Sequence, residues 1–110
     1  MNGRLTVSEN MADLAGLAAA YDAYRISYGG KEAPAVDGVR GDQQFFLSFA
    51  QTWRVKAREA ALRQQVVVDS HAPNRYRALT VRNLDAWYRA FGVKPGQKLH
   101  LAQAERIRIW

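Results

Sequence analysis

Two acidic residues four positions apart open the long alanine-rich segment near the start of the chain. They are Glu9 and Asp13, in the stretch SENMAD, residues 8–13. In a helix this spacing places both carboxylates on one face, on adjacent turns. Carboxylates on an apolar face are costly to bury unless a cation, a metal ion or hydrogen-bond donors meet them. The simpler alternative is that acids favour the first turn of a helix, where the helix dipole attracts negative charge.

A second group of chemically capable residues lies in VDSHAPNRYR, residues 68–77. His71, one of two histidines in the chain, follows Asp69 by two positions and precedes Arg77 by six. A carboxylate beside an imidazole fixes its tautomer and favours its charged form, and an arginine can hold a carbonyl or carboxylate group. Such a trio suits the stabilisation of a developing oxyanion. The alternative is a loop histidine packed beside a proline, with its charged neighbours in solvent.

The segment that carries the first two acids is predicted to be a helix over residues 8–28. Its larger apolar and aromatic side chains recur at three- and four-residue spacing, and the pair Gly29–Gly30 then ends it. These side chains are Leu14, Leu17, Tyr21, Tyr24 and Tyr28. On a helical wheel the two acids share a side with small residues, whereas Asp22 and Arg25 point the other way.

A second helix is predicted to begin with Asp42 as its N-cap, after a loop over residues 32–41 that is rich in proline and glycine. Apolar side chains line one face of this helix and polar ones the other. The apolar face consists of Phe45, Phe46, Phe49, Trp53 and Ala57, and the polar face of Gln44, Gln51, Arg54 and Arg58. Residues 57–65 continue helically, with or without a break, before Val66–Val68 lead towards His71.

A last helix is predicted to begin at an Asn83 cap and to end at Gly92. Its inward-facing residues are Leu84, Trp87, Tyr88 and Phe91. The tail ERIRIW, residues 105–110, alternates like a short strand. The chain is therefore predicted to be mainly α-helical, with little strand.

Length and composition favour one globular unit over residues 1–110. Hydrophobic residues make up 48% and charged residues 24%, a balance that argues against disorder. No apolar run is long enough to span a bilayer, so we expect no membrane segment in this chain. The absence of cysteine excludes disulfides and thiolate zinc sites.

The basic character of the chain raises the alternative of a nucleic-acid-binding module. The net charge is +6, from 16 lysines and arginines against 10 acids. These basic residues are spread from Arg4 to Arg108 without a dense cluster, and we find no helix-turn-helix or other recognition motif. We therefore expect no nucleic acid among the partners.

Several stretches together resemble the C-terminal part of the neprilysin and endothelin-converting-enzyme family of zinc metallopeptidases. They are NGRLTVSENMADLAGL, DGVRGDQQFFLSFAQTW, HAPNRYR, VKPG and the terminal RIRIW. The resemblance covers nearly the whole chain in the family's order, and the missing cysteines make it look like a bacterial-type member. It implies the C-terminal helical portion of a gluzincin-type metallopeptidase catalytic domain.

The resemblance also implies roles for the acids and the histidine. It places the third zinc ligand on Glu9 and, on Asp13, a carboxylate that holds a metal-ligating histidine by its other ring nitrogen. The histidine that stabilises the transition state falls on His71, with Asp69 as the acid that orients it.

Two further positions match residues that meet the substrate. The arginine that binds a peptide carbonyl falls on Arg77. Trp53 matches a position lining the pocket for the side chain just after the scissile bond, a pocket that usually prefers apolar residues. The neighbouring Thr52 departs from the more common aliphatic residue.

The largest departure from the family pattern is that the 110 residues contain no HExxH motif. Zinc peptidases of this kind use its two histidines as metal ligands and its glutamate as general base. We therefore expect this chain to be the C-terminal part of a larger peptidase catalytic domain and to be inactive alone. Its expected partners are peptide substrates and the N-terminal remainder of the same protein, and its expected cofactor is one zinc ion in the intact enzyme.

The resemblance implies a parent protein that is exported, either periplasmic, extracellular or membrane-anchored. A different class of function also stays open: a catalytically dead domain that keeps the helical core and binds peptides or a partner chain. Such a domain would present a groove containing Arg77 and Trp53, whereas a part of a larger domain would expose apolar surface where the rest packs.

Overall fold

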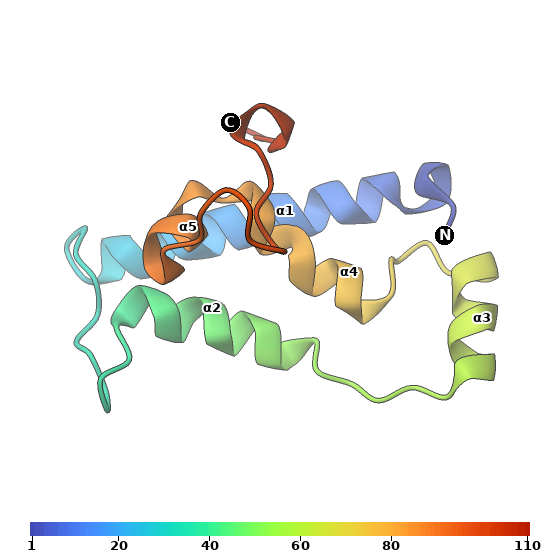
Figure 1. The fold of residues 1–110 in the computed structure, drawn as a ribbon, viewed down its shortest axis with the longest axis horizontal. Coiled ribbons are helices and arrows are strands. Elements are labelled where there is room, and N and C mark those ends of the chain that lie inside the picture. Colours follow the sequence, from blue (N-terminus) through green and yellow to red (C-terminus); the bar gives the residue numbers. More distant parts are fainter.

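The protein is described over all of residues 1–110 by a computed structural model, and it is built almost entirely from helices (Figure 1). Its only β pairing is an isolated bridge between Val36 and Val39. The prediction of a mainly α-helical chain is confirmed. In chain order the elements are α1 (Gly3–Ser27), α2 (Gly41–Thr52), α3 (Glu59–Val68), α4 (Asn74–Ala78), the 3-10 helix η1 (Leu79–Asn83), α5 (Asp85–Phe91) and the 3-10 helix η2 (Gln103–Glu105).

Helix α1 is longer at its start than the sequence pattern predicts. The Asn2 side chain caps it by accepting hydrogen bonds from the backbone N–H groups of Arg4 and Leu5. Its end is at the predicted place, because Gly29 and Gly30 take φ values of 65° and 82°. Such positive angles suit glycine and bring the Gly30 N–H back onto the helix.

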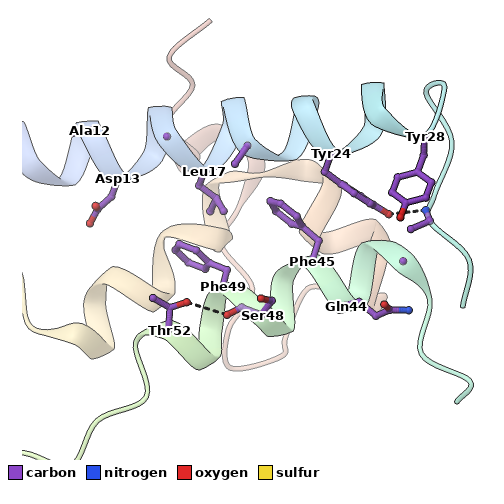
Figure 2. Close-up of a pocket in the computed structure, with 14 residues that line it drawn as sticks. Ala12, Asp13, Leu17, Tyr24, Tyr28, Gln44, Phe45, Ser48, Phe49 and Thr52 are labelled. Atoms are coloured by element: carbon purple, nitrogen blue, oxygen red, sulfur yellow. Dashed lines mark hydrogen bonds between the residues drawn. The ribbon is translucent and has the colours of Figure 1, made fainter. Parts of the chain in front are cut away.

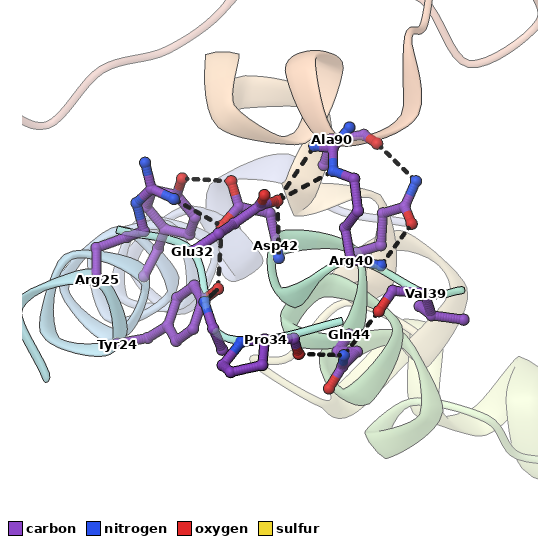
Figure 3. A network of polar contacts seen from close by, with 12 residues as sticks. Tyr24, Arg25, Glu32, Pro34, Val39, Arg40, Asp42, Gln44 and Ala90 are labelled. Atoms are coloured by element: carbon purple, nitrogen blue, oxygen red, sulfur yellow. Dashed lines mark hydrogen bonds and ion pairs between the residues drawn. The ribbon is translucent and has the colours of Figure 1, made fainter. Parts of the chain in front are cut away.

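Helix α2 begins one residue before Asp42, and the predicted capping role of Asp42 is wrong. The N-cap is Arg40, whose backbone N–H donates to the Gln43 side chain at 3.0 Å. Asp42 is buried instead, and its carboxylate accepts hydrogen bonds from Tyr21 Oη and Tyr24 Oη at 3.0 and 3.2 Å (Figure 3). Donors far away in the sequence thus bind the Asp42 side chain, which the local pattern predicted to cap the helix.

Arg25 also differs from its prediction. The helical wheel placed it on the side of α1 opposite the two acids, which suggested a solvated side chain, yet its Nη1 lies 3.3 Å from Asp42 Oδ1. A long arginine side chain can reach around the helix to a buried carboxylate, so its Cα direction alone is a poor guide. The ion pair ties the C-terminal end of α1 to the start of α2 (Figure 3).

The hydrophobic core lies where α1, α2, η1 and α5 meet. Phe46 of α2 is its most buried large side chain, at 2% exposure. The other buried members are Leu17, Val81, Ala86, Trp87, Tyr88 and Ala90, with Phe45 and Phe49 packed against them. The predicted inward faces of α2 and α5 are confirmed in the main. Two residues are exceptions. Phe91 lies at the end of α5 and is 38% exposed, and Ala57 lies beyond the end of α2 and is also exposed.

The C-terminal region departs from its prediction at two points. Helix α5 begins at Asp85 after Leu84, and Asn83 does not cap it but accepts the Ile107 N–H at 2.9 Å. The tail forms no strand, because no other strand of this chain is available to pair with it. Arg106 and Arg108 of the tail bind the Asp85 carboxylate instead. Gly92, at φ 61°, ends α5 as predicted.

Helix α3 follows a break over residues 54–58 and includes the valine run Val66–Val68. None of its residues is buried, and it lies at one end of the molecule, where it leads into the segment that holds His71 (Figure 1). No helix of the structure combines the length and apolar character needed to cross a bilayer.

Candidate active site

The N-terminal part of α1 lies close to the segment between α3 and α4. Glu9, on α1, directs its carboxylate at the imidazole of His71, and the Glu9 Oε2 and His71 Nε2 atoms are 3.3 Å apart. Both side chains are about two-fifths exposed, at 42% and 41%. Glu9 of α1 and His71 of the segment between α3 and α4 therefore meet at the surface, where a ligand from outside the chain can reach both.

Asp69 holds the other side of the imidazole. Its Oδ1 accepts the His71 backbone N–H at 2.8 Å and lies 2.9 Å from His71 Nδ1. These bonds lower the pKa of the Asp69 carboxyl below its ordinary value, the backbone N–H of His71 having the largest effect and the imidazole the next. Asp69 thus stays ionised and turns His71 Nε2 towards Glu9.

One turn further along α1, Asp13 meets Arg77 of α4. Arg77 Nε and Nη2 each donate to one oxygen of the Asp13 carboxylate, and both distances are 2.8 Å. The paired side chains are only 19% and 15% exposed. The hydrogen bonds to Asp13 raise the pKa of Arg77 above its ordinary value. Within this chain, Asp13, which was predicted to hold a metal-ligating histidine, is therefore paired with Arg77, which was predicted to bind the substrate.

Trp53 completes this second cluster. The Arg77 Cζ atom lies 4.0 Å from the centroid of the Trp53 ring, within the range of a cation–π interaction. Phe49 packs edge-on against the same indole, with ring centroids 6.1 Å apart. The indole Nε1 is buried and donates to no atom of the chain. Trp53 follows directly after α2, so the end of that helix supports the arginine.

The two clusters form one continuous site. The carboxylates of Glu9 and Asp69 are close enough to Arg77 to stabilise its positive charge electrostatically, after the larger effect of Asp13. All six residues singled out from the sequence are thus brought together. The contact between Asp13 and Arg77 and the packing of Phe49 on Trp53 were not predicted. The i, i+4 spacing of Phe49 and Trp53 carried a signal for their packing.

A groove of about 640 Å³ runs from this site between α1 and α2 (Figure 2). Small residues of α1 and aromatic residues of both helices line it. They include Asp13, Gly16, Ala20 and Tyr24 from α1, and Phe45, Phe49 and Thr52 from α2. Asp13 therefore belongs both to the polar cluster and to the end of an apolar groove.

The side chains of this chain alone do not fit a complete zinc site. A catalytic zinc ion normally takes three protein ligands. No group of three or more histidine, cysteine, aspartate or glutamate side chains could hold a metal ion here. Glu9 and His71 approach each other, but Asp69 occupies the far side of the imidazole. Any resident zinc would need ligands from outside these residues.

The helical architecture is that of the helical portion of a metallopeptidase catalytic domain. The chain superposes with a TM-score of 0.93 and 43% identity on the cryo-electron-microscopy structure of the zinc metalloprotease Zmp1 of Mycobacterium tuberculosis in an open state. A crystal structure of Zmp1 with an inhibitor agrees equally well, at a TM-score of 0.93. Both alignments cover 98% of this chain and 17% of the Zmp1 chain.

Residues 1–107 match the model of peptidase family M13, and the chain belongs to this family. It is 41% identical to human endothelin-converting enzyme-like 1 over 114 aligned residues, which cover 100% of this chain and 14% of that protein. It is 36% identical to a neutral endopeptidase of Lactococcus lactis, covering 99% of this chain and 16% of the relative. The predicted family is confirmed, and the chain spans only about a sixth of these proteins.

Proposed function

We propose that this chain is the C-terminal segment of the catalytic domain of a zinc metalloendopeptidase that hydrolyses peptide bonds in oligopeptides. The observation that carries the proposal is the convergence of Glu9 and His71, 3.3 Å apart, with Asp69 on the other imidazole nitrogen. Residues 1–110 act as one unit of that domain, and alone they are inactive because they lack HExxH.

Glu9 supplies the third metal ligand of the complete site. Its carboxylate is 42% exposed, and Asp69 rather than Glu9 takes Nδ1 of the imidazole, so the Glu9 oxygens can turn to a cation from the remainder of the protein. A zinc ion at such a site acidifies water and polarises a carbonyl group. Two upstream histidines would provide the other ligands, as HExxH does in peptidases of this type.

His71 stabilises negative charge that develops on the scissile carbonyl oxygen. Asp69 fixes the imidazole through Nδ1, so a protonated ring presents Nε2–H on the side of Glu9. A donor that is already oriented needs no reorganisation when the charge develops, which makes it more effective in the transition state than in the ground state. Asp69 is therefore the orienting acid and His71 the oxyanion donor.

Arg77 binds a backbone carbonyl of the peptide and keeps the substrate in register. Its guanidinium lies beside the His71 segment and is partly exposed, at 19%. Trp53, at the end of α2, forms a wall of the neighbouring pocket for an apolar substrate side chain. Asp13 anchors Arg77 and, in the intact domain, also faces a ligating histidine from the other part of the protein.

The remainder of the same protein packs against the apolar groove between α1 and α2. Gly16 lies in this groove, and a methyl group added there would meet no atom within 4 Å. Large apolar side chains are exposed elsewhere too, such as Val55 at 65% and Val67 at 74%. Exposed apolar area on this scale is typical of a surface that another part of a protein covers. The intact protein is exported in this proposal.

The direct test is to sequence the coding DNA upstream of Met1 and to express the complete open reading frame. An in-frame HExxH, together with zinc-dependent cleavage of an oligopeptide by the full-length protein but not by residues 1–110, is the expected result. A stop codon directly upstream, or a full-length product without peptidase activity, would contradict the proposal. The helical unit would then be better explained as a peptide- or protein-interaction domain.

A further inference from the structure

We infer that Trp53 is a positioning residue for Arg77, and that its indole face fixes the plane of the guanidinium that binds the substrate. This inference rests on the proposed peptidase function and deepens it. It gives Trp53 a task distinct from lining the pocket for a substrate side chain. It predicts that Trp53 acts on catalysis through Arg77 rather than through the identity of the side chain in that pocket.

Two different contacts hold the guanidinium of Arg77. Within its plane, Nε and Nη2 donate to the two oxygens of Asp13 at 2.8 Å each. This fork-to-fork pairing sets the rotation of the group but still lets it rock about the axis that joins the two groups. Arg77 Cζ lies over the Trp53 ring, 4.0 Å from the ring centroid. The indole therefore limits how far the guanidinium can rock towards it.

The two constraints leave one edge of the guanidinium available. Nη1 makes no hydrogen bond within the chain, whereas Nε and Nη2 are taken by Asp13. A guanidinium presents its five N–H groups in one plane, so fixing that plane fixes the direction of the Nη1 donors. Arg77 is therefore preorganised to offer Nη1 to a carbonyl oxygen, and both Asp13 and Trp53 contribute to that preorganisation.

The indole is itself positioned by packing and not by a polar contact. Its Nε1 donates to no atom of the chain, and its ring meets the edge of Phe49 with an interplanar angle of 74°. Trp53 directly follows α2, and α2 is anchored in the core by its buried residue Phe46. The core thus supports α2, α2 presents the indole, and the indole supports Arg77, which belongs to a helix of only five residues.

A double-mutant cycle in the full-length protein tests the inference. Trp53→Leu keeps an apolar wall but removes the π face, and it should lower kcat/KM about 10-fold, mainly by raising KM. In an Arg77→Ala background the same change should cost less than about 2-fold, because its target is gone. Trp53→Phe, which keeps a smaller ring, should restore much of the loss. Equal effects of Trp53→Leu in both backgrounds would overturn the inference.

Phe45→Leu is the matched control. It removes an aromatic ring of α2 that packs on Tyr21, Tyr24 and Phe46 rather than on Trp53, so the partner of Arg77 stays in place. Its effect on kcat/KM should be equal with and without Arg77, so the two losses multiply. Coupling of Phe45 to Arg77 as strong as that of Trp53 would show a general packing effect and would contradict a specific role for the indole.

A readout that needs no peptidase activity separates this inference from the proposed function. In the NMR spectrum of the protein, the Arg77 Nε–Hε signal should be displaced by the indole ring current and protected from solvent exchange. Trp53→Leu should abolish the displacement and speed exchange, whereas Phe45→Leu, which removes a ring that does not pack on Trp53, should not. If the Arg77 signal responds to Trp53→Leu but the full-length protein has no peptidase activity, the proposed function is refuted and the role of Trp53 stands. An Arg77 signal that is insensitive to Trp53→Leu would refute the stack.

Discussion

The carboxylate of Glu9 and the imidazole Nε2 of His71 lie 3.3 Å apart, although one residue belongs to α1 and the other to the segment after α3. The contact brings an acid suited to metal binding beside a donor suited to an oxyanion. Asp69 completes the arrangement by taking Nδ1 at 2.9 Å. Under the proposed function, this pair marks where the remainder of the site is built.

Replacing His71 should affect turnover more than substrate binding. In the full-length protein, His71→Ala should lower kcat about 10²- to 10³-fold and change KM little, because its bond strengthens as the oxyanion forms. His100→Gln is the control, since His100 packs on Tyr88 at a ring distance of 5.5 Å, away from the site. Steady-state kinetics on one oligopeptide decide the matter: a raised KM with unchanged kcat would assign His71 to substrate binding.

The pKa of Asp69 should depend on His71 in a graded way. The backbone N–H of His71 has the largest effect and the imidazole the second, and both lower this pKa. His71→Ala removes only the imidazole, so the pKa of Asp69 should rise but stay below the ordinary value of about 3.9. A ¹³C NMR titration of the Asp69 carboxyl measures it. A full return to the ordinary value would mean that the backbone bond is unimportant.

The same lowered pKa has a consequence for stability. A carboxyl whose folded-state pKa is depressed stabilises the fold above its unfolded-state pKa and loses that contribution as the pH falls through the folded value. Acidification from pH 5 towards pH 2 should therefore detach the His71 segment. Amide hydrogen exchange of His71, whose N–H donates to Asp69 at 2.8 Å, reports the loss. Acceleration already at neutral pH would contradict this account.

Asp42 should be the acid whose loss most weakens the joint between α1 and α2. It is 7% exposed and accepts bonds from Tyr21, Tyr24 and Arg25. Asp42→Ala should lower the free energy of unfolding by about 2 kcal/mol, because it removes the acceptor of two half-buried hydroxyls and of an arginine. Urea denaturation measures the change. The exposed Asp22, changed to alanine, should cost less than about 0.5 kcal/mol, and a similar cost at both positions would argue against the network.

The tyrosines of this network add a second pH dependence. Burial, followed by the hydrogen bond to Asp42, raises the pKa of Tyr21, and burial also raises that of Tyr24. A raised folded-state pKa contributes stability that is present below the unfolded value of about 10 and is lost as the pH rises through the folded value. Unfolding free energies should therefore fall above pH 10 in the wild type, and less steeply in Tyr21→Phe. Equal slopes would exclude the role of Tyr21.

The groove between α1 and α2 allows a test of how the chain joins the remainder of the protein. No atom lies within 4 Å of a methyl group added at Gly16, and the groove that Gly16 lines has a volume of about 640 Å³, so Gly16→Leu should leave the unfolding free energy of residues 1–110 unchanged or slightly raised. In the full-length protein the same leucine should clash with whatever fills the groove and lower the melting temperature by several degrees. Asp22→Leu, outside the groove, is the control. If Gly16→Leu left the melting temperature of the full-length protein unchanged, the groove would stay open in the intact protein.

Local signals in the sequence predicted the ends of helices better than their beginnings. Gly29 and Gly92 both take the positive φ angles that the pattern implied, because few other residues adopt that conformation readily. Asp42 has the composition of an N-cap, but two tyrosines and an arginine from α1 compete for its carboxylate. A capping pattern describes only neighbours in sequence and cannot anticipate such partners.

The sequence singled out the six residues that the structure brings together, whereas their contacts were only partly predictable. The spacing of Asp69 and His71 is local, so their contact followed from the sequence. The pairing of Asp13 with Arg77 joins residues 64 positions apart, and no periodicity encodes it. The alternating tail suggested a strand, but strand formation needs a partner, and this chain places Asp85 there to bind Arg106 instead.

The zinc content of the full-length protein tests the central claim most directly. After dialysis against a competing chelator, the wild type should retain about one zinc ion per polypeptide. His71→Ala should retain the same amount while losing turnover, and Glu9→Ala should lose most of its zinc, because it removes one of three protein ligands. If Glu9→Ala kept zinc as tightly as the wild type, Glu9 would not be a metal ligand, and the assignment of this helical unit to the metal site would be wrong.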